Sequence, residues 1–290
     1  TVHTGVSPHG QGTETTFAQM TADMLGVTPA DIEVLHSDTD ILPAGGGTGA
    51  SRGMIAGGTS LQLVLEDAQE KLTAIAAHLL DCLQGDVVLQ DGSAFNRNDP
   101  EQTVLFARLA QAAHTEELLP PGQEPGLDFI GSNTLGKSPY AFGAHVAVVE
   151  VSRETGAIKI LKYVGIHDSG TIVNPMLAEG QVHGAVVQGI GQALFEGMVY
   201  DPDGQPLSGS LMDYALPRAD NMPSFTFETM ETPSPITGLG VKGIGELPTL
   251  AAPAAIANAV MDALSQTGVR HIDTPLTTEK VWRALHGSNP

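Results

Sequence analysis

The fold is decided by Ala144-His145-Val146-Ala147-Val148-Val149-Glu150-Val151 and, after a turn, Ile158-Lys159-Ile160-Leu161-Lys162-Tyr163-Val164. Apolar and polar residues alternate in the first segment, and this period of two is typical of a half-buried strand. Glu154-Thr155-Gly156 supplies turn residues between the two segments. Together they predict a β-hairpin, and this hairpin stands in a chain that otherwise contains long helical patterns.

Helical patterns lie on both sides of the hairpin. Residues 15–25 place apolar side chains near i, i+3 and i+4 spacing, residues 178–195 contain four glycines, and residues 253–264 are rich in alanine. A glycine inside a helix costs about 1 kcal/mol relative to alanine, so the four glycines predict tight packing against a neighbour or a ligand. The expected fold class is α+β, a mixed α/β module.

Other segments predict shorter elements and a boundary. Strands are expected at residues 32–36 and 225–230, and Asp91-Gly92 is a hairpin turn. A long helix is expected up to about Leu83, with Ser51 as its cap. A connection rich in proline and glycine follows residue 115, so we expect one subdomain at 1–115 and a second at 116–290.

Composition and charge exclude several classes of protein. The chain has 290 residues and a net charge of −20, with only 13 Lys and Arg, which disfavours a nucleic-acid partner because phosphate backbones require a basic patch. Cys82 is the only cysteine and is expected to pack in the core, so this chain cannot build a disulfide framework, a zinc site or an iron–sulfur site. Nothing resembles a signal peptide or an apolar span of ~18 residues. Since the first residue is Thr1 rather than Met, we expect a piece of something larger.

Two glycine-rich loops precede helical segments in the first part of the chain. The first contains Gly10-Gln11-Gly12-Thr13, and the second runs from Gly45 to Gly53, with Ser51 and Arg52 near its end. Backbone N–H groups at a helix N-terminus attract anions, and a guanidinium suits bidentate contact with phosphate. The pair predicts a cradle for a phosphate-bearing cofactor. Two ordinary alternatives stay open, a capped helix start for the first loop and a flexible surface loop for the second.

A third glycine-rich loop carries an acid. Gly240-Val241-Lys242-Gly243-Ile244-Gly245-Glu246 delivers one carboxylate just ahead of an alanine-rich helix. Glycine lets a backbone approach a ligand closely, so a lone acid at this place predicts a positioned base. Residues 238–243 also match G-x-G-x-x-G, but prolines precede them and Pro248 interrupts the segment after them. A dinucleotide site needs a strand and a helix that join the loop directly, so we reject a nucleotide-binding dehydrogenase.

Some polar residues are compatible with two roles. Asp168-Ser169-Gly170 comes after a predicted strand and is either a turn or a ligand contact. Gln181 and Gln188 lie on one face of their helix, where they either point at a cofactor or bond to the backbone. His167 and the other histidines are expected to be structural or hydrogen-bonding, because no H-x3-H or H-E-x-x-H spacing indicates a metal site.

Several motifs occur together in one order along the chain. They are Ser7-Pro8-His9-Gly10-Gln11-Gly12-Thr13-Glu14-Thr15-Thr16, Asp38-Thr39-Asp40, Ser51-Arg52, Asp168-Ser169-Gly170, Asn174-Pro175, Gly180-Gln181-Val182-His183-Gly184-Ala185 and Lys242-Gly243-Ile244-Gly245-Glu246. As a set they resemble the molybdopterin-binding large subunit of the xanthine dehydrogenase, aldehyde oxidase and aerobic carbon monoxide dehydrogenase family. The resemblance covers nearly the whole chain and corresponds to the second half of that subunit.

The resemblance implies a molybdenum hydroxylase that acts on an aldehyde, an N-heterocycle or a similar small molecule. Residues 1–115 and 116–290 would be two cofactor-binding subdomains that hold molybdopterin, in its cytosine dinucleotide form, with molybdenum bound through the pterin and not by the protein directly. The expected partners are the N-terminal half of the subunit, an Fe-S subunit and an FAD subunit. The expected location is cytoplasmic, or periplasmic where a partner chain carries an export signal.

The resemblance also implies roles for single residues. Glu246 is the expected general base, and burial beside the apolar helix is expected to raise its pKa toward neutral pH. The residues expected to hold the cofactor are Gln11, Gly12, Thr13, Ser51, Arg52, Gly53, Gln181, Lys242 and Gly243. Thr13 and Gly53 depart from the family pattern, which often has His and Ser there. An alternative stays open in which the chain is a non-catalytic cofactor-holding or assembly partner with a structural glutamate.

Overall fold

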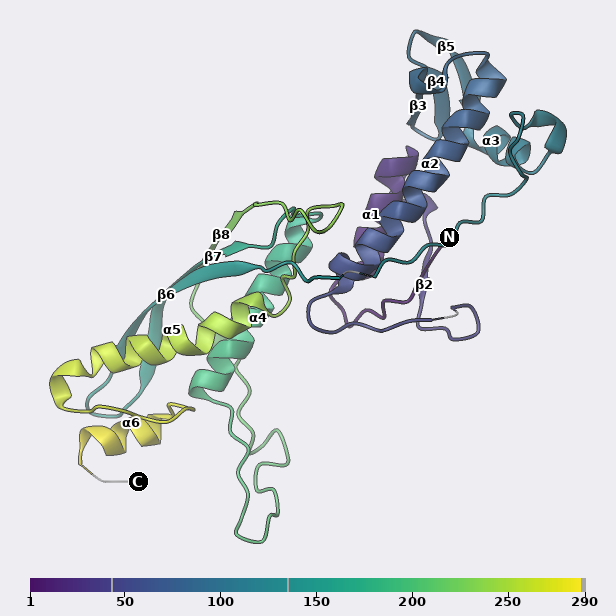
Figure 1. The fold of residues 1–290 in the computed structure, drawn as a ribbon. Coiled ribbons are helices and arrows are strands. Elements are labelled where there is room, and N and C mark those ends of the chain that lie inside the picture. The colour runs from purple at the N-terminus through teal and green to yellow at the C-terminus, as the bar shows by residue number, and fades with distance from the viewer. Residues whose placement is uncertain (43, 135, 288–290) are drawn as a thin grey trace. The chain divides into compact units, whose positions relative to one another are not determined.

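The computed structural model describes residues 1–42, 44–134 and 136–287 (Figure 1). The chain divides into two compact units. Unit 1 comprises Thr1–Ser138 with Ser234–Val241, and unit 2 comprises Pro139–Pro233 with Lys242–Pro290. Both units contain helices and sheets, which confirms the α+β class. The subdomain division predicted between residues 115 and 116 lies inside unit 1 and stays a prediction.

In its described residues, unit 1 contains three α-helices and two small sheets. Its helices are α1 (Thr13–Leu25), α2 (Thr59–Leu80) and α3 (Phe106–Ala113). Its strands are β1 (Val2–Thr4), parallel to β2 (Val34–His36), and an antiparallel sheet of β3 (Val87–Gln90), β4 (Ser93–Asn96) and β5 (Asp99–Leu105). The predicted turn at Asp91-Gly92 joins β3 to β4, and α1 ends at Gly26 with φ 68°, as glycine allows. One face of α2 packs against α3 and this sheet, where Ile75 and Leu109 are fully buried.

Unit 2 is a three-stranded sheet covered by helices. Its strands are β6 (Phe142–Val151), β7 (Ile158–Asp168) and β8 (Phe225–Met230), and its helices are α4 (Pro175–Leu194), α5 (Leu247–Ala263) and α6 (Thr278–Leu285). The predicted hairpin is confirmed, because β6 pairs with β7 antiparallel, and β8 adds to β7 in parallel. Tyr163, Ile190 and Ile256 form the centre of the core.

Helices α4 and α5 approach closely because of a glycine. A Cβ at Gly189 would lie 2.6 Å from Cβ of Ala252 and 2.9 Å from Cδ of Pro253, so only a residue without a side chain fits there. Gly180 and Gly184, by contrast, lie on a part of α4 where a Cβ would meet nothing within 4 Å. The predicted tight packing is therefore confirmed at Gly189 and also at Gly191, where a Cβ would lie 2.5 Å from Glu196 Oε1 and 3.1 Å from Cδ of Pro217, while Gly180 and Gly184 leave an open face.

Helix α5 begins earlier than its sequence predicts. We expected it from Pro253, with Pro248 as an interruption, but it starts at Leu247. The expectation was wrong because Pro248 lies in the first helical turn, where its missing N–H has no intrahelical partner to lose. Glu246 is thus the residue immediately before a helix of 17 residues.

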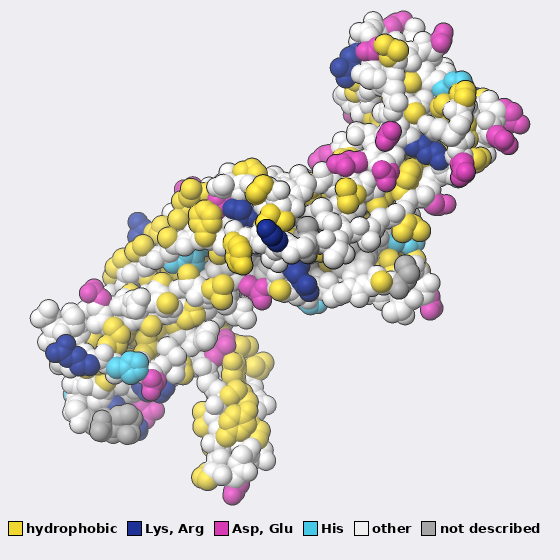
Figure 2. All heavy atoms as spheres, in the orientation of Figure 1, with side chains coloured by type: hydrophobic (Ala, Val, Ile, Leu, Met, Phe, Trp, Pro, Cys, Tyr) yellow, Lys and Arg dark blue, Asp and Glu magenta, His cyan; other side chains and the backbone are white. Residues whose placement is uncertain are grey.

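A long loop between α4 and β8 extends away from the sheet of unit 2 (Figure 1). Many of its apolar side chains are exposed, and Figure 2 shows them gathered along the loop. Leu211 is 75% exposed and Met212 is 92% exposed. None of the helices in the described part of the chain combines the length and hydrophobicity that a membrane crossing requires.

Candidate functional site

The first glycine-rich loop of unit 1 leads directly into α1. Gly12 adopts φ 79° and stands at the cap position of α1, and within the described residues no side chain caps this helix start. Thr13 is buried as the first helical residue, and Gln11 is half-buried. Helix N-termini without a side-chain cap present N–H groups that suit an anion or a polar acceptor. The geometry is therefore compatible with the predicted cradle.

The second glycine-rich loop is tied to the first. Gln11 Nε2 donates a hydrogen bond to Thr48 Oγ1 at 3.3 Å, so residues 37 positions apart in sequence lie together. Gly47 N donates to Gly5 O at 3.2 Å, which fixes the loop against the strand that opens the chain. A Cβ at Gly5 would lie only 2.8 Å from Ala44 O, so the two backbones meet where a side chain would not fit.

The end of the second loop differs from expectation. Ser51 does not cap α2, because Ala50 and Ser51 adopt φ 50° and 53° and a π-helical turn, Gly53–Gly58, precedes α2. Such π-turns occur often at functional sites. Arg52 is exposed and its Nε donates to Gly49 O at 3.3 Å. The six residues predicted in unit 1 therefore lie in the two joined loops and at the first positions of the helical segments that follow them.

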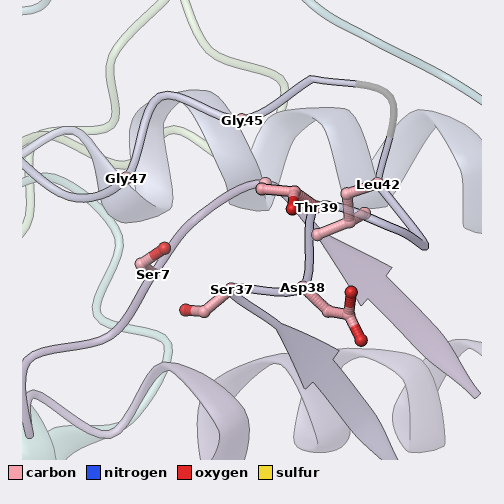
Figure 3. Close-up of a pocket in the computed structure, with 8 residues that line it drawn as sticks. Ser7, Ser37, Asp38, Thr39, Leu42, Gly45 and Gly47 are labelled. Atoms are coloured by element: carbon pink, nitrogen blue, oxygen red, sulfur yellow. The ribbon is translucent and has the colours of Figure 1, made fainter.

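A hollow of about 220 Å³ lies beside these loops (Figure 3). It is lined by Gly5, Ser7, Ser37, Asp38, Thr39, Leu42, Gly45 and Gly47. Its lining consists mainly of hydroxyls, glycine backbone and one carboxylate. Since Gly46, Gly47 and Gly49 have nothing within 4 Å of a Cβ placed on them, this side of the loop is open.

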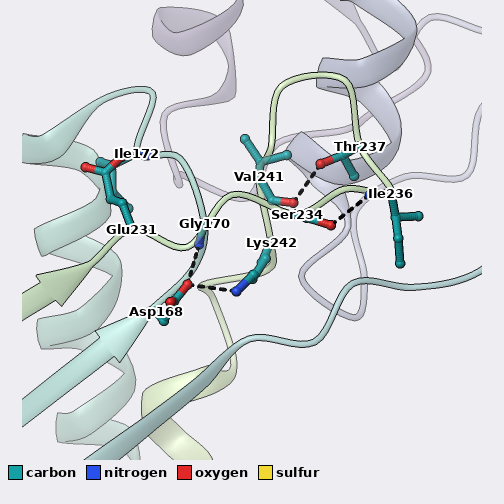
Figure 4. Close-up of polar contacts among 9 residues, drawn as sticks. All are labelled: Asp168, Gly170, Ile172, Glu231, Ser234, Ile236, Thr237, Val241 and Lys242. Carbon is teal, nitrogen blue, oxygen red and sulfur yellow. Dashed lines mark hydrogen bonds and ion pairs between the residues drawn. The ribbon is translucent and has the colours of Figure 1, made fainter.

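In unit 2 a buried ion pair joins the end of β7 to the third glycine-rich loop (Figure 4). Lys242 Nζ donates to Asp168 Oδ1 at 2.9 Å, and the two side chains are 8% and 0% exposed. Gly170 N donates to the same carboxylate oxygen at 3.0 Å, and Lys242 N donates to Ser169 O at 2.7 Å. Burial acts to raise the pKa of Asp168, but hydrogen bonds from Lys242, Thr232 and Gly170 outweigh it and hold that pKa at about 2.

The chain on each side of Glu246 is held in place by a side-chain hydrogen bond. Lys242 is fixed on one side, and on the other Thr249 Oγ1 donates to Ala185 O of α4 at 2.6 Å. Leu250 N donates to Glu246 O, so the glutamate backbone already belongs to the first turn of α5. The side chain of Glu246 is exposed. The expected burial of this carboxylate is therefore not provided by the described residues of this chain.

The other predicted residues of unit 2 have different surroundings. Gln181 is half-buried on α4, and Gly243 is next to Lys242 in the loop. Gln188, which shares a face of α4 with Gln181, has its Oε1 3.2 Å from Thr249 Oγ1 and so contacts α5. Lys242, Gly243 and Glu246 thus lie in one short loop, while Gln181 stands on a separate helix.

Three hydrogen-bonded side chains, Tyr163, His145 and His167, lie on β6 and β7 next to Asp168. Tyr163 Oη is 2.7 Å from His145 Nδ1, and His145 Nε2 is 2.6 Å from His167 Nε2. Burial, together with the neighbouring His145, lowers the pKa of His167 to about 4. Both rings are therefore neutral near pH 7, and one Nε2 must donate while the other accepts. This agrees with the expected hydrogen-bonding role of His167, although its partner was not foreseen.

The pairing of Asp168 with Lys242 is the feature that sequence reasoning missed. Asp168 was expected to be either a turn residue or a ligand contact, and Lys242 a cofactor contact. One signal could have found the pair: an acid at the end of a buried strand requires a cation, and the chain has only 13 Lys and Arg.

The residues present fit a large organic cofactor that carries phosphate. Open glycine backbone, a half-buried amide and an exposed guanidinium are donors suited to phosphate and polar ring atoms. In unit 2, Ser169 Oγ is buried with no hydrogen-bond partner among the described residues. Across residues 1–42, 44–134 and 136–287, no group of three or more His, Cys, Asp or Glu is placed to hold a metal ion.

No dinucleotide fold surrounds residues 238–243. Although α5 begins soon after this loop, β8 ends at Met230, and in the described chain no strand leads directly into the loop. The rejection of a dinucleotide site therefore rests on the missing strand and no longer on Pro248.

Comparison with known proteins gives one consistent result. The sequence model of the molybdopterin cofactor-binding domain matches residues 1–223. The chain is 39% identical over 288 residues to the nicotine 6-hydroxylase large subunit of Paenarthrobacter nicotinovorans, a match that covers 99% of this chain and 35% of that protein. It is 34% identical to the carbon monoxide dehydrogenase large chain of Hydrogenophaga pseudoflava, with 98% of this chain and 35% of that protein covered.

Solved structures agree. Quinoline 2-oxidoreductase from Pseudomonas putida 86 superposes with a TM-score of 0.87 and 35% identity, over 98% of this chain and 36% of that one. The Cu,Mo carbon monoxide dehydrogenase superposes with a TM-score of 0.89 and 32% identity, over 99% and 36%. The chain thus spans about a third of the length of the relatives it matches.

Proposed function

The chain belongs to the molybdopterin cofactor-binding domain family, as part of a large subunit like those of xanthine dehydrogenase and carbon monoxide dehydrogenase, and on that premise we propose that it serves a molybdenum hydroxylase. The observation that carries this proposal is the pair of joined glycine loops in unit 1 together with Glu246 at the start of α5 in unit 2. The proposed reaction is oxidative hydroxylation of a small molecule. Two relatives are named for nicotine and quinoline, which are N-heterocycles, and this favours an N-heterocycle over an aldehyde as the substrate.

Unit 1 is proposed to hold the phosphate-bearing part of the cofactor. The residues that would do so are Gln11, Gly12, Thr13, Ser51, Arg52 and Gly53. The bond from Gln11 to Thr48 makes the two loops one surface, which suits a ligand with more than one phosphate. We therefore propose the cytosine dinucleotide form of molybdopterin. In unit 2, Gln181 and Gly243 are proposed as further cofactor contacts.

Glu246 is proposed as the general base. When bound, the cofactor would supply the molybdenum that takes up the electron pair of the C–H bond that breaks. A carboxylate oxygen of Glu246 accepts the proton released as the new carbon–oxygen bond forms. Because the side chain is exposed in this chain, the cofactor, the substrate and the rest of the large subunit are proposed to supply the apolar surroundings that a base at neutral pH requires.

The replacement Glu246→Gln tests the base. It preserves size and hydrogen bonding but removes the proton acceptor, so we expect kcat to fall about 10²- to 10⁴-fold with the molybdenum and pterin content unchanged. Glu154→Gln, at the exposed turn between β6 and β7, is the matched control and should retain wild-type turnover. Full turnover by the fully loaded Glu246→Gln enzyme would show that another group is the base.

Partner chains are proposed to carry the electrons away. Cys82 is the only cysteine of this chain, so an Fe-S subunit and an FAD subunit must provide the electron-transfer centres, with the rest of the large subunit completing the site. A cytoplasmic location is proposed for the complex. Purification of the complex followed by metal and pterin analysis tests this assignment. Absence of both molybdenum and pterin would favour the alternative of an assembly partner.

A further inference from the structure

We propose that Lys242 is a positioning residue, which holds the loop that carries Glu246 by its buried ion pair with Asp168. This inference rests on the proposed role of Glu246 and replaces the expectation that the Lys242 ammonium binds the cofactor. It assigns to Asp168, at the end of β7, the task of anchoring a catalytic loop. Three features of unit 2 support it: the direction of the ammonium, the attachment of the other end of the loop, and the presence of a charged pair.

The ammonium of Lys242 points into the unit. Its side chain is 8% exposed, Nζ lies 2.9 Å from Asp168 Oδ1, and the same nitrogen lies 5.0 Å from the centroid of the Phe142 ring. Phe142 and Asp168 are direct partners in the β6–β7 ladder, so both contacts come from one position of the sheet. The main chain adds a third contact, from Lys242 N to Ser169 O at 2.7 Å. Lys242 is therefore attached to the end of β7 by its side chain and its backbone.

The loop is attached again just after Glu246. Thr249 Oγ1 donates to Ala185 O, and Gly189 lets α5 approach α4 at Ala252 and Pro253. Between the anchors lie Gly243 and Gly245, which lose more backbone entropy on ordering than other residues. A base must be held within hydrogen-bond reach of its proton, and a misplacement of about 1 Å reduces rates about 100-fold. The two anchors confine the carboxylate in a loop that glycine would otherwise leave free.

A buried ion pair contributes little net free energy to folding. Removing two charges from water offsets most of their attraction, and apolar residues of similar volume often do as well or better. A charged pair does supply a directional bond at a defined position. Here that position is four residues before Glu246, at the first residue of the Lys242–Pro290 part of unit 2.

The test uses the assembled enzyme and a neutral version of the pair. Lys242→Met alone leaves Asp168 buried and unpaired, so Lys242→Met/Asp168→Asn is the informative variant because it removes both charges. We expect its kcat to fall about 10- to 100-fold with KM and molybdenum content near the wild-type values. In the cofactor-free complex we expect faster hydrogen exchange for residues 243–250 and unchanged exchange in β6 and β7. Arg283→Met, which breaks the exposed pair with Glu279 on α6, is the control and should change neither readout.

Combination with Glu246→Gln separates this inference from the proposed function. If Lys242 acts through Glu246, adding Glu246→Gln to the neutral pair should give no lower kcat than Glu246→Gln alone. Multiplicative losses, or wild-type exchange at residues 243–250 in the neutral pair, would overturn the positioning role even if Glu246 is the base. Full activity of Glu246→Gln would overturn the base, and the exchange result would then decide whether the loop is anchored as proposed.

Discussion

The loop of unit 1 at Gly45–Gly53 and the loop of unit 2 that ends at Glu246 have similar composition but are held by different forces. The first is held by backbone: Gly47 N bonds to Gly5 O, and glycines meet where no Cβ fits. The second is held by a buried charge pair between Lys242 and Asp168. Glycine content alone therefore does not reveal how rigid a loop is.

The difference corresponds to the tasks proposed for the two loops. A loop that offers N–H groups to phosphates needs a backbone that can come close to its ligand, and glycine supplies this. A loop that carries a base needs one side chain at one place, and a directional bond supplies this. Changes of pH that act on unit 2, and substitutions that act on unit 1, can therefore test the contrast separately in each unit.

Lowering the pH should reduce the free energy of unfolding of unit 2, because His167 becomes protonated. Its folded-state pKa of about 4 lies below the ordinary value of 6.5, so the unfolded chain binds more protons between these values. The stabilisation is therefore present above pH 6.5 and is lost as pH falls toward 4, by about 3 kcal/mol. Urea unfolding followed as a function of pH measures it. His167→Gln should flatten this dependence, and an unchanged dependence would contradict the assignment.

Protonation of Asp168 should reduce the stability of unit 2 over a second, lower range of pH. Its folded-state pKa of about 2 lies below the ordinary 3.8, so the stabilisation by the Lys242 pair is present above pH 3.8 and is lost as pH falls toward 2. The glycine contacts of the unit 1 loop do not titrate. Hydrogen exchange followed as pH falls from 4 to 2 should therefore become faster at residues 243–250 at a higher pH than at the Gly5–Gly47 contact. The reverse order would contradict the charge-based attachment of the unit 2 loop.

Gly5→Ala should disturb the unit 1 loop. The new methyl group would lie 2.8 Å from Ala44 O, which forces the two backbones apart and costs about 1–3 kcal/mol by overpacking. Thermal unfolding of the complex measures the loss. Gly46→Ala is the matched control, because a Cβ there meets nothing within 4 Å, and its stability should stay within about 0.5 kcal/mol of wild type. Equal effects of the two substitutions would show that the close approach at Gly5 does not hold the loop.

Gln11→Ala should have the smallest effect. It removes the bond to Thr48 Oγ1 that joins the two loops of unit 1, which is worth about 0.5–1.5 kcal/mol. Denaturant titration and the pterin content after dialysis provide the measurement. Gln102→Ala removes hydrogen bonds to Asp99 and Asn96 elsewhere in unit 1 and is the control. Pterin loss that is the same in both variants would argue against the loop-to-loop bond.

The helices and strands were predicted more accurately from the sequence than the contacts between distant parts of the chain. The hairpin at β6–β7, the strand Phe225–Met230 and a helix that ends near residue 25 were predicted from periodicity. The start of α5 was wrong because the position of a proline in a helix decides its effect. The cap at Ser51 was wrong because Ala50 and Ser51 take left-handed conformations, which local sequence does not predict for these residues.

Local sequence was sufficient for the element types, the fold class and the set of loops that indicate the family, because alternation, helical spacing and glycine act over a few residues. The meeting of distant residues depended on the folded chain. Asp168 and Lys242 are 74 positions apart, Gln11 and Thr48 are 37 apart, and β8 pairs with β7 across the whole of α4. Such contacts depend on burial: Asp168 requires a cation only because β7 carries it out of water, and which cation reaches it depends on how the chain folds back.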